Sequence, residues 1–303
     1  MKVTLLIITY NWPEALRMVL ESAMHQSKMP DEIVIGDDGS TAETKQLIDS
    51  YAKSSPVPVV HVWQEDKGFR RTVILNKAIA KATGDYIIQV DGDVILDSHF
   101  VADHLEVAQE GCFVCGSRVR LEASVSKRLL QDKHARLKLW NMPLPYMLNS
   151  IRSRMLRNYL AFRYARRIDH LRGCNMAYWK ADALLVNGYN EDLKQWGHED
   201  GEFAYRLHFA GIRKKALKMG GIMYHLYHRE ASKTNEQYHV KVLQQVKLHQ
   251  LNWCQNGIAL RVADCGYKRN GHHVGKPYMM TISFLASKSA IVLTISSEIS
   301  SDT

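Results

Sequence analysis

A chain of 303 residues that is 46% hydrophobic and 23% charged describes a soluble globular protein, long enough for one large domain or two smaller ones. The apolar patch at 284–295 is interrupted by Lys288, and no apolar run reaches the roughly 18 residues of a membrane-spanning helix, which excludes a membrane span. The net charge of +9 is uneven, because residues 118–172 carry 14 basic and three acidic side chains.

The first part of the chain alternates between short apolar runs and segments of helical periodicity. The runs lie at 3–8, 33–36, 58–63, 86–90 and 112–115. They are mostly β-branched and nearly continuous, as in strands that are covered on both faces. The pattern predicts an α/β fold with a mostly parallel sheet in a βαβ arrangement. The first run ends in Thr-Tyr-Asn and not in small residues, so it indicates a strand and not a secretion signal.

Helix ends are marked by capping residues. Asn11 is expected to cap a helix with Pro13 in its first turn, and residues 40–43, Ser-Thr-Ala-Glu, have the form of a capping box. Gly84 is expected to end a helix over residues 70–82.

Polar groups follow three of the predicted strands directly. They are Thr9-Tyr10-Asn11, Asp37-Asp38-Gly39-Ser40 and Asp91-Gly92-Asp93. Ligands of doubly wound sheets bind beyond the carboxyl ends of the strands, so all three groups are expected at one edge of the sheet. An isolated Asp-Gly-Asp is more often a solvated turn. Polar clusters at three strand ends indicate a binding site instead.

Four segments are predicted along the chain. They are a nucleotide-sugar-binding half at 1–118, a basic helical insert at 119–172, a catalytic half at 173–258 and a tail at 259–303. Apolar side chains form a stripe in the insert at positions 148, 151, 155, 159 and 162. Further helices are expected at 199–210 and 236–254, and no structure is expected for the last 40 or so residues.

The five cysteines argue against both zinc and disulfides. Cys112 and Cys115 have no second pair at metal-site spacing, and their apolar surroundings favour core thiols. Few cysteines, and an odd number of them, fit a reducing compartment, so the protein is expected to be cytoplasmic.

Asp91 and Asp93 form a candidate metal site. Two carboxylates this close repel unless solvent screens them or a cation lies between them. Beside helix N-termini they suit a nucleoside diphosphate with Mg²⁺ or Mn²⁺ shared between carboxylates and phosphates. His225 and His228, in MYHLYHRE, could complete the coordination sphere, although histidines of this kind more often simply end an aromatic-rich strand.

A transfer reaction also needs a base, and QWGHEDGEF supplies Glu199 and Asp200 at the start of a predicted helix. Acids in a first helical turn are ordinarily complements of the helix dipole, which is the alternative reading. Trp196 offers an aromatic face that could stack on a sugar ring, or it fills the core.

These motifs resemble those of a known family. TYNWP, DEIVIGDDGS and NKAIAKATGDYIIQVDGD are similar to the nucleotide-binding half of inverting GT-A glycosyltransferases of family 2. LRGCNMAYWKADALLVNGYNEDLKQWGHEDGEFAYRL resembles the C-terminal module of the galactosyltransferase and chondroitin-synthase type, with its WGxED motif. The two resemblances cover roughly 1–118 and 172–230.

The resemblance implies a metal-dependent inverting glycosyltransferase with a GT-A fold and no redox cofactor. Such an enzyme moves a hexose, N-acetylhexosamine or hexuronate from a UDP-sugar to a hydroxyl of a glycan or lipid-linked glycan. Synthesis of cell-surface polysaccharide or lipopolysaccharide is the expected context. The choice among UDP-Gal, UDP-GalNAc, UDP-Glc, UDP-GlcNAc and UDP-glucuronate stays open.

On the nucleotide side, the resemblance implies contacts from Thr9, Tyr10, Asn11, Asp38 and Asp91. Asp38 would contact the uracil ring, and Asp91 would lie by the ribose and the metal. Arg71 is expected near the base or the diphosphate. Leu75 stands before Asn76 where many relatives carry arginine, which leaves Arg70 and Arg71 as alternatives.

On the transfer side, the resemblance implies that Asp93 is the direct metal ligand, joined by His228, with His225 as a second candidate. Asp200 would be the catalytic base, and Glu199 would orient the acceptor. The residues expected on the donor-sugar and acceptor side are Gly173, Cys174, Asn175, Trp196 and Gly197.

Two other functions fit parts of the pattern. A sugar nucleotidyltransferase would need a glycine-rich phosphate loop after the first strand, which ITYNWP lacks, and the same lack counts against an NAD-dependent dehydrogenase. A non-catalytic sugar- or nucleotide-binding subunit would have no need for a base such as Asp200.

The composition of the basic insert predicts a binding partner separate from the sugar substrates. Arginines interleave with Leu, Met, Tyr and Phe over 147–168, as in segments that contact an anionic membrane surface. A solvated helix face is the plain alternative, and nucleic acid is not expected. The protein is therefore expected to be cytoplasmic, with a peripheral position at the inner face of the membrane as the bolder reading.

Overall fold

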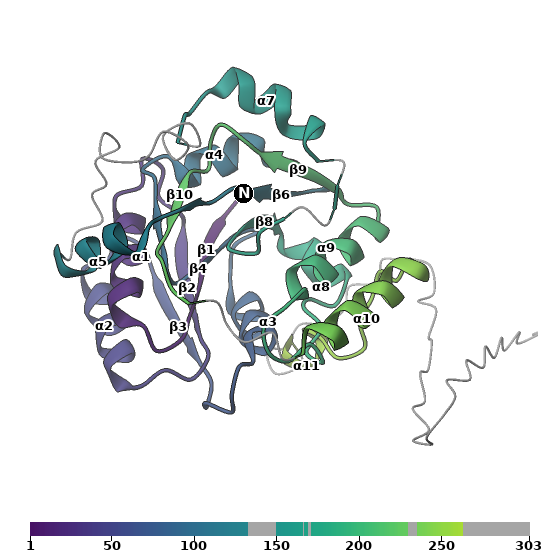
Figure 1. The fold of residues 1–303 in the computed structure, drawn as a ribbon, viewed down its shortest axis with the longest axis horizontal. Coiled ribbons are helices and arrows are strands. Elements are labelled where there is room, and N and C mark those ends of the chain that lie inside the picture. Colours follow the sequence, from purple (N-terminus) through teal and green to yellow (C-terminus); the bar gives the residue numbers. More distant parts are fainter. Residues whose placement is uncertain (133–149, 166, 169–170, 230–234, 263–303) are drawn as a thin grey trace, which may run out of the picture. The chain divides into compact units, whose positions relative to one another are not determined.

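The computed structural model describes residues 1–132, 150–165, 167–168, 171–229 and 235–262. Met1–Tyr267 form one compact unit (Figure 1), and the described residues all belong to it. The predicted unstructured tail lies outside the described residues from position 263 onward. Within the described part, none of the helices is both long and apolar enough to cross a bilayer.

A seven-stranded sheet runs through this unit in the order β3-β2-β1-β4-β8-β6-β9. Its parallel half consists of β1 (Val3–Thr9), β2 (Glu32–Asp37), β3 (Val59–Trp63) and β4 (Tyr86–Asp91). The other half consists of β8 (Asn175–Trp179), β6 (Cys112–Gly116) and β9 (Arg213–Leu217). Strand β8 is antiparallel to both β4 and β6, whereas β6 and β9 are parallel. The predicted strands and the mostly parallel sheet are confirmed.

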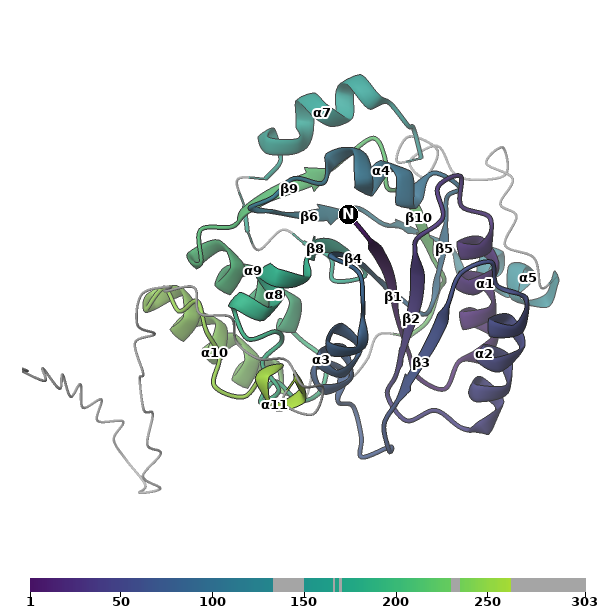
Figure 2. The ribbon, with the colours of Figure 1, turned by 180° about the vertical axis from the view of Figure 1, so that it is seen from behind.

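Helices cover both faces of the sheet (Figures 1 and 2). One face is packed by α1 (Pro13–Met24), α2 (Ala42–Ser54) and α4 (Phe100–Val107). The other is packed by α3 (Arg71–Lys81), α8 (Lys180–Leu185) and α9 (Glu199–Phe209). Strand β1 shows the consequence, since Val3, Leu5 and Ile7 enter the first core and Leu6 and Ile8 the second. Side chains of both faces are buried, so the strand reads as one apolar run.

A small second sheet joins distant parts of the chain. It consists of β5 (Val94–Leu96), β10 (Met223–His225) and β7 (Val119–Arg120) in the order β5-β10-β7. Strand β10 is antiparallel to β5, and the N–H of Leu226 donates to the carbonyl oxygen of Asp93 at 2.9 Å. The segment that carries the two candidate histidines is thereby held against the turn that carries Asp93.

The two predicted helix caps are wrong. The N-caps of α1 and α2 are Trp12 and Thr41, and neither makes a side-chain capping bond. Asn11 has a positive φ of 43° and accepts a hydrogen bond from the N–H of Thr41 at 2.9 Å, across to the next loop. The hydroxyl of Ser40 in turn accepts from the N–H of Asn11 at 2.8 Å. These residues therefore fasten the loops after β1 and β2 to each other.

Gly84 lies where the helix before it has already ended, since α3 ends at Lys81. A Cβ atom at position 84 would lie 2.5 Å from the hydroxyl of Thr4, so close packing against β1 requires the glycine.

The basic insert contains helices α5 (Ala123–Asp132) and α7 (Arg154–Arg163), and its residues 133–149 lie outside the described residues. The helices predicted at 199–210 and 236–254 are found as α9 and α10 (Glu236–Leu248), and α11 (Ala259–Val262) follows. Strand β6 belongs to the predicted first segment and pairs with β8 and β9 of the third. Those two segments therefore share one sheet.

Candidate active site

The polar strand ends meet at one edge of the sheet, as the strand pattern predicted. In the parallel register, Thr9 at the end of β1 lies beside Asp37, and Ile8 lies beside Asp91. The carboxyl ends of β1, β2 and β4 thus bring their polar residues together, which is where doubly wound sheets bind ligands.

Gly92 sets the geometry of the Asp-Gly-Asp turn. A Cβ atom here would lie 2.8 Å from the carbonyl oxygen of Ile8, so only glycine fits against the end of β1. Asp91 and Asp93, on either side of it, have different partners. Asp91 forms an ion pair with Arg71, whereas Asp93 faces the histidines of β10 and the segment after it.

Asp93, His225 and His228 form a candidate metal site. Among the described residues, they are the one group of three His, Cys, Asp or Glu side chains whose ligand atoms all lie within 4.8 Å of one another. The Nε2 atom of His228 is 3.1 Å from Oδ2 of Asp93, and that of His225 is 3.6 Å away. The structure therefore brings together both predicted histidines with the predicted aspartate.

Both histidines are oriented for metal binding by their backbone contacts. Nδ1 of His225 is 2.8 Å from the carbonyl oxygen of Leu226, and Nδ1 of His228 is 2.7 Å from that of Arg229. A carbonyl oxygen only accepts, so each Nδ1 carries the proton and donates it. Each Nε2 is then the atom that faces Asp93, an arrangement common among metal-binding histidines.

The electrostatics of Asp93 also fit a cation. Burial would raise the pKa of its carboxyl, but the hydrogen bond from His228 and the charges of His225, His228 and Arg118 hold the pKa below its usual value. The hydrogen bond to Asp93 raises the pKa of His228 in return. Among the described residues, Oδ1 of Asp93 is buried without a hydrogen-bond partner. A buried carboxylate oxygen is costly when nothing compensates it, and a divalent cation would do so.

The donor set distinguishes between the two predicted metals. Two imidazoles and one carboxylate suit Mn²⁺, whereas Mg²⁺ prefers a shell of oxygen ligands. The residues present therefore fit a divalent cation, and Mn²⁺ fits them better than Mg²⁺.

Asp91 lies outside this group, and its role as a metal ligand stays a prediction. Its Oδ1 atom lies 2.5 Å from Nη2 of Arg71, at the first turn of α3. The turn at Gly92 directs the two carboxylates to different elements. The guanidinium of Arg71 provides the positive charge beside Asp91.

Arg71 links Asp91 to the two acids that open α9. Its Nη1 atom lies 3.3 Å from Oδ1 of Asp200 and 3.9 Å from Oε1 of Glu199. A series of neighbouring side chains thus connects the metal group to the acids of α9. It leads from His228 to Asp93, past Gly92 to Asp91, and on to Arg71 and Asp200. The candidate metal group and the candidate base therefore belong to one site.

The acids of α9 influence each other's protonation. Burial raises the pKa of Glu199 to about 8, and the negative charge of Asp200 adds to the rise, while Arg71 opposes it. Burial likewise raises the pKa of Asp200, against the opposing charge of Arg71. At neutral pH Glu199 holds a proton, and Asp200 is a stronger base than an ordinary aspartate. A base with a raised pKa is better suited to accept a proton in catalysis.

A buried polar layer supports Asp200. The hydroxyl of Tyr189 lies 3.5 Å from Oδ1 of Asp200 and 3.0 Å from Oε1 of Gln89. Tyr178 donates to the same Gln89 oxygen at 2.8 Å, and the Gln89 amide donates to the carbonyl of Gly173 at 3.1 Å. Of these supporting residues, only Gly173 had a role predicted from the sequence. A glutamine inside the apolar run YIIQVD was the available signal, since a buried amide needs partners.

Gly173 leaves the space that Asp200 occupies. A Cβ atom at position 173 would lie 1.6 Å from Oδ2 of Asp200. Gly173 was predicted to line the donor-sugar side, and the structure places it directly against the candidate base.

Replacing Gly173 with alanine is expected to lower the transfer rate by about 100-fold, because a base displaced by an ångström loses its alignment. Rates of UDP release would measure the effect. Gly201→Ala is the matched control, since Gly201 is the residue after Asp200 and a Cβ there meets nothing within 4 Å. Equal rates for the two variants would contradict the contact.

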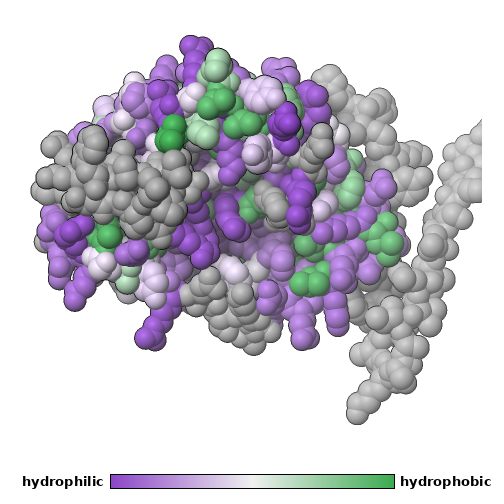
Figure 3. Space-filling model, turned by 45° about the horizontal axis from the view of Figure 1, so that its top comes forward, coloured by the Kyte–Doolittle hydropathy of each residue, from purple (hydrophilic) through white to green (hydrophobic). Residues whose placement is uncertain are grey.

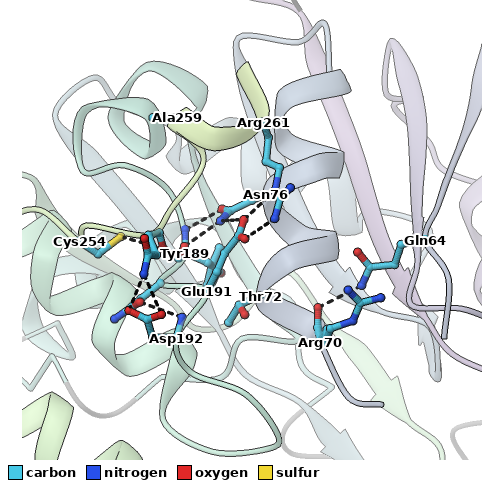
Figure 4. A network of polar contacts seen from close by, with 12 residues as sticks. Gln64, Arg70, Thr72, Asn76, Tyr189, Glu191, Asp192, Cys254, Ala259 and Arg261 are labelled. Atoms are coloured by element: carbon cyan, nitrogen blue, oxygen red, sulfur yellow. Dashed lines mark hydrogen bonds and ion pairs between the residues drawn. The ribbon is translucent and has the colours of Figure 1, made fainter. Parts of the chain in front are cut away.

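Polar contacts fix the segment before α9 to helix α3 (Figure 4). The Asn76 amide donates to the carbonyl of Tyr189 at 2.7 Å and accepts from the N–H of Tyr189 at 2.8 Å. Thr72 donates to the carbonyl of Leu193 at 3.3 Å. Because α3 also carries Arg71, this network fixes the position of Arg71 relative to the acids of α9.

The structure separates Arg70 from Arg71. The backbone N–H of Arg70 donates to Oδ2 of Asp38 at 2.8 Å, and Gln64 donates to Oδ1 (Figure 4 shows Gln64 beside Arg70). Burial raises the pKa of Asp38. Arg70 thus lies beside the predicted uracil contact, whereas Arg71 lies among the carboxylates.

The residues after β1 are placed at the same edge. Thr9 is buried at the strand end, and half of Tyr10 is exposed, with its hydroxyl donating to Asp66 at 2.9 Å. Asn11 uses its side-chain oxygen to join the two loops. Their contact with a nucleotide stays a prediction.

The predicted sugar-side residue Asn175 is engaged elsewhere. Its side chain is fully buried, accepts a hydrogen bond from His104 at 2.9 Å and donates to the carbonyls of Ser117 and Gly221. It has no surface to offer a sugar, and its side chain instead joins the His104 ring to two backbone carbonyls. Cys174 is also buried, and burial raises the pKa of its thiol.

His239, which the sequence analysis did not single out, holds the loop before the acids. The ring of this buried α10 residue lies 2.9 Å from the carbonyl oxygen of Gly197 and 2.8 Å from that of Lys194. Trp196, between these two positions, is partly exposed. The loop with the predicted Trp196 and Gly197 is therefore anchored immediately before Glu199.

Two family models match the chain. Residues 4–181, more than half of the chain, match the one described as "Glycosyl transferase family 2". Residues 153–229 match the one described as "N-terminal domain of galactosyltransferase". The two matches together include every predicted site residue.

Two of the similar curated proteins are longer than this chain. The chondroitin synthase of Escherichia coli is 23% identical over 239 residues, which cover 73% of this chain and 34% of that protein. The validoxylamine A glucosyltransferase of Streptomyces hygroscopicus subsp. limoneus is 28% identical over 229 residues, covering 69% and 48%. The chain thus spans about half or less of the length of these relatives.

Solved structures share the fold. Residues 1–349 of S. aureus TarS in complex with UDP-GlcNAc align with a TM-score of 0.59 at 17% identity, covering 87% of this chain and 71% of that one. The mannosyltransferase PcManGT from Pyrobaculum calidifontis, in complex with GDP-Man and Mn²⁺, aligns with a TM-score of 0.53 at 18% identity, covering 76% and 58%. These likenesses confirm the predicted GT-A fold.

Proposed function

The chain belongs to glycosyl transferase family 2, and on this basis we propose that it transfers a sugar from a UDP-sugar to a hydroxyl of a glycan acceptor with inversion. One observation carries the proposal. Arg71 joins Asp91, two residues from the metal group, to Asp200, the residue suited to act as base. A donor diphosphate at the metal group would then lie across from the base.

The metal group has a defined role in this proposal. A divalent cation held by Asp93, His225 and His228 would neutralise charge on the diphosphate as UDP leaves. The protein itself orients the ligands, since both histidines are fixed by Nδ1–H bonds to backbone carbonyls.

Asp200 removes the proton from the acceptor hydroxyl as that oxygen attacks C1 of the sugar. The bond from C1 to the UDP oxygen breaks on the opposite face, so one displacement inverts the anomeric configuration. Glu199, protonated at neutral pH, can donate a hydrogen bond to the acceptor and orient it. Tyr189 and Gly173 keep Asp200 in place.

The similar proteins support a UDP-sugar as donor. Chondroitin synthase is the name of two of them, and TarS has been solved with UDP and with UDP-GlcNAc. We therefore propose an N-acetylhexosamine or hexuronate as the first donors to test, with hexoses next. The acceptor is proposed to be a glycan, free or lipid-linked, of the kind built into cell-surface polysaccharide or lipopolysaccharide.

The test is a donor screen with Mn²⁺ present. Thermal shift with UDP-GlcNAc, UDP-GalNAc, UDP-glucuronate, UDP-Glc and UDP-Gal should identify a stabilising donor. That donor should then release UDP when glycan acceptors are added. Release of pyrophosphate from UTP and a sugar phosphate would instead indicate a nucleotidyltransferase. Donor binding without UDP release across the acceptor panel would favour a non-catalytic binding subunit.

A further inference from the structure

Helix α7 exposes its apolar side chains and buries a charged one. An amphipathic helix on a globular protein normally buries its apolar side chains and exposes its charged ones. In α7, Arg157 and Ala161 are buried, whereas Met155, Tyr159 and Phe162 are exposed. The predicted apolar stripe of the insert thus faces outward wherever it is described.

The inner face of α7 is anchored by ion pairs to α4. The guanidinium of Arg157 is fully buried, lies 2.5 Å from Oδ1 of Asp103 and also pairs with Glu106. Arg152 lies 2.8 Å from the same oxygen of Asp103. Removing one partner of a buried pair is strongly destabilising. The helix is therefore fixed with its apolar side outward and cannot roll over without breaking this cluster.

The exposed apolar side chains are concentrated at this helix. Of the 16 large hydrophobic side chains that are exposed among the described residues, six lie between 151 and 164: Ile151, Met155, Leu156, Tyr159, Phe162 and Tyr164. Met155 is 79% exposed and Tyr159 63%. Figure 3 brings the side of α7 forward and shows hydrophobic surface among hydrophilic surface there. Such a patch on an otherwise polar surface marks an interaction site.

Basic side chains border the patch. The Arg154 side chain is 78% exposed, and Arg163 stacks over the ring of Tyr159 at 5.6 Å. Arg213 of the neighbouring β9 lies 5.1 Å from the ring of Phe162. Arginines interleaved with methionine and aromatic rings match a bilayer interface, where rings enter the headgroup region and guanidinium groups meet lipid phosphates.

We propose that the outward face of α7 docks on an anionic lipid bilayer and holds the enzyme at a membrane surface. A second copy of the chain is a poorer occupant, because a two-fold contact would set these arginines against one another. The proposal does not depend on glycosyl transfer, since its readout is lipid binding.

Vesicle flotation with the full chain tests the proposal. Vesicles of phosphatidylcholine with about 30% phosphatidylglycerol should carry the protein upward, and pure phosphatidylcholine should carry little of it. The double variant Met155→Ser/Tyr159→Ser should bind the anionic vesicles about ten-fold more weakly. Leu248→Ser is the matched control, because Leu248 is 71% exposed on α10, away from the patch, and its binding should equal that of the unchanged protein.

Three results would overturn the proposal. They are absence of binding to anionic vesicles, equal binding by the double variant, and equal loss in the Leu248 variant. A concentration-dependent dimer in light scattering that the double variant abolishes would assign the patch to a second copy. Unchanged melting temperatures show that the variants are folded, as expected for surface positions.

Discussion

Replacing Asp200 with asparagine is expected to lower the transfer rate by about 1,000-fold while UDP binding persists. Asparagine keeps the shape of the side chain but cannot accept the proton of the acceptor hydroxyl. Arg71 keeps its ion pair with Asp91 and its contact with Oε1 of Glu199, so the site should stay assembled. Initial rates of UDP release and calorimetric titration with UDP would measure the two quantities separately.

Asp192→Asn is the control for this experiment. Asp192 precedes α9 in the chain, is exposed and accepts a hydrogen bond from the side-chain amide of Asn256 at 2.9 Å (Figure 4). Its variant should retain nearly full activity. If Asp200→Asn kept turnover close to that of the unchanged protein, another residue would have to be the base.

Replacing Asp93 with alanine is expected to remove the response of activity to Mn²⁺ and to weaken Mn²⁺ binding by at least about 100-fold. Asp93 supplies the carboxylate of the group, and the two remaining histidines offer the ion no negative charge. Titration of Mn²⁺ by electron paramagnetic resonance measures binding directly, without an activity assay.

Histidine variants make the metal prediction more specific. His228→Ala should also weaken Mn²⁺ binding, since its Nε2 faces Asp93. His99→Ala is the control, because the His99 side chain is 44% exposed, much like the 40% of His228, and pairs with Asp97 outside the site. An Mn²⁺ titration unchanged in Asp93→Ala would rule out this group as the metal site.

The strands and the edge of the sheet where their polar ends meet were predictable from the sequence. Strands packed on both faces, such as β1 and β4, must be apolar at nearly every position, so their extent is visible in the residues alone. Parallel strands end at one edge, so the groups at Thr9, Asp38 and Asp91 had to meet.

The side-chain contacts of individual residues at that edge were not predictable. Asp91 and Asp93 look alike in the sequence, and only the approach of α3 gives Asp91 an arginine while β10 gives Asp93 two histidines. The side chain of Asn11, a residue with positive φ, likewise bonds to the neighbouring loop and does not cap α1. Local capping rules consider one helix at a time, and the N–H donor that the Asn11 oxygen meets belongs to another element.

Helix α7 shows most clearly what each level determines. Its sequence specifies an amphipathic helix with an apolar stripe, because side-chain spacing follows the period of the backbone. The spacing does not specify which side faces the protein. Asp103 of α4 settles that, since its buried carboxylate needs a cation and the buried guanidinium of Arg157 supplies it, while Glu106 pairs with Arg157 from a more exposed position. The sequence alone therefore determines that α7 is amphipathic. The carboxylates of α4, which the fold brings against the helix, determine which side faces the protein.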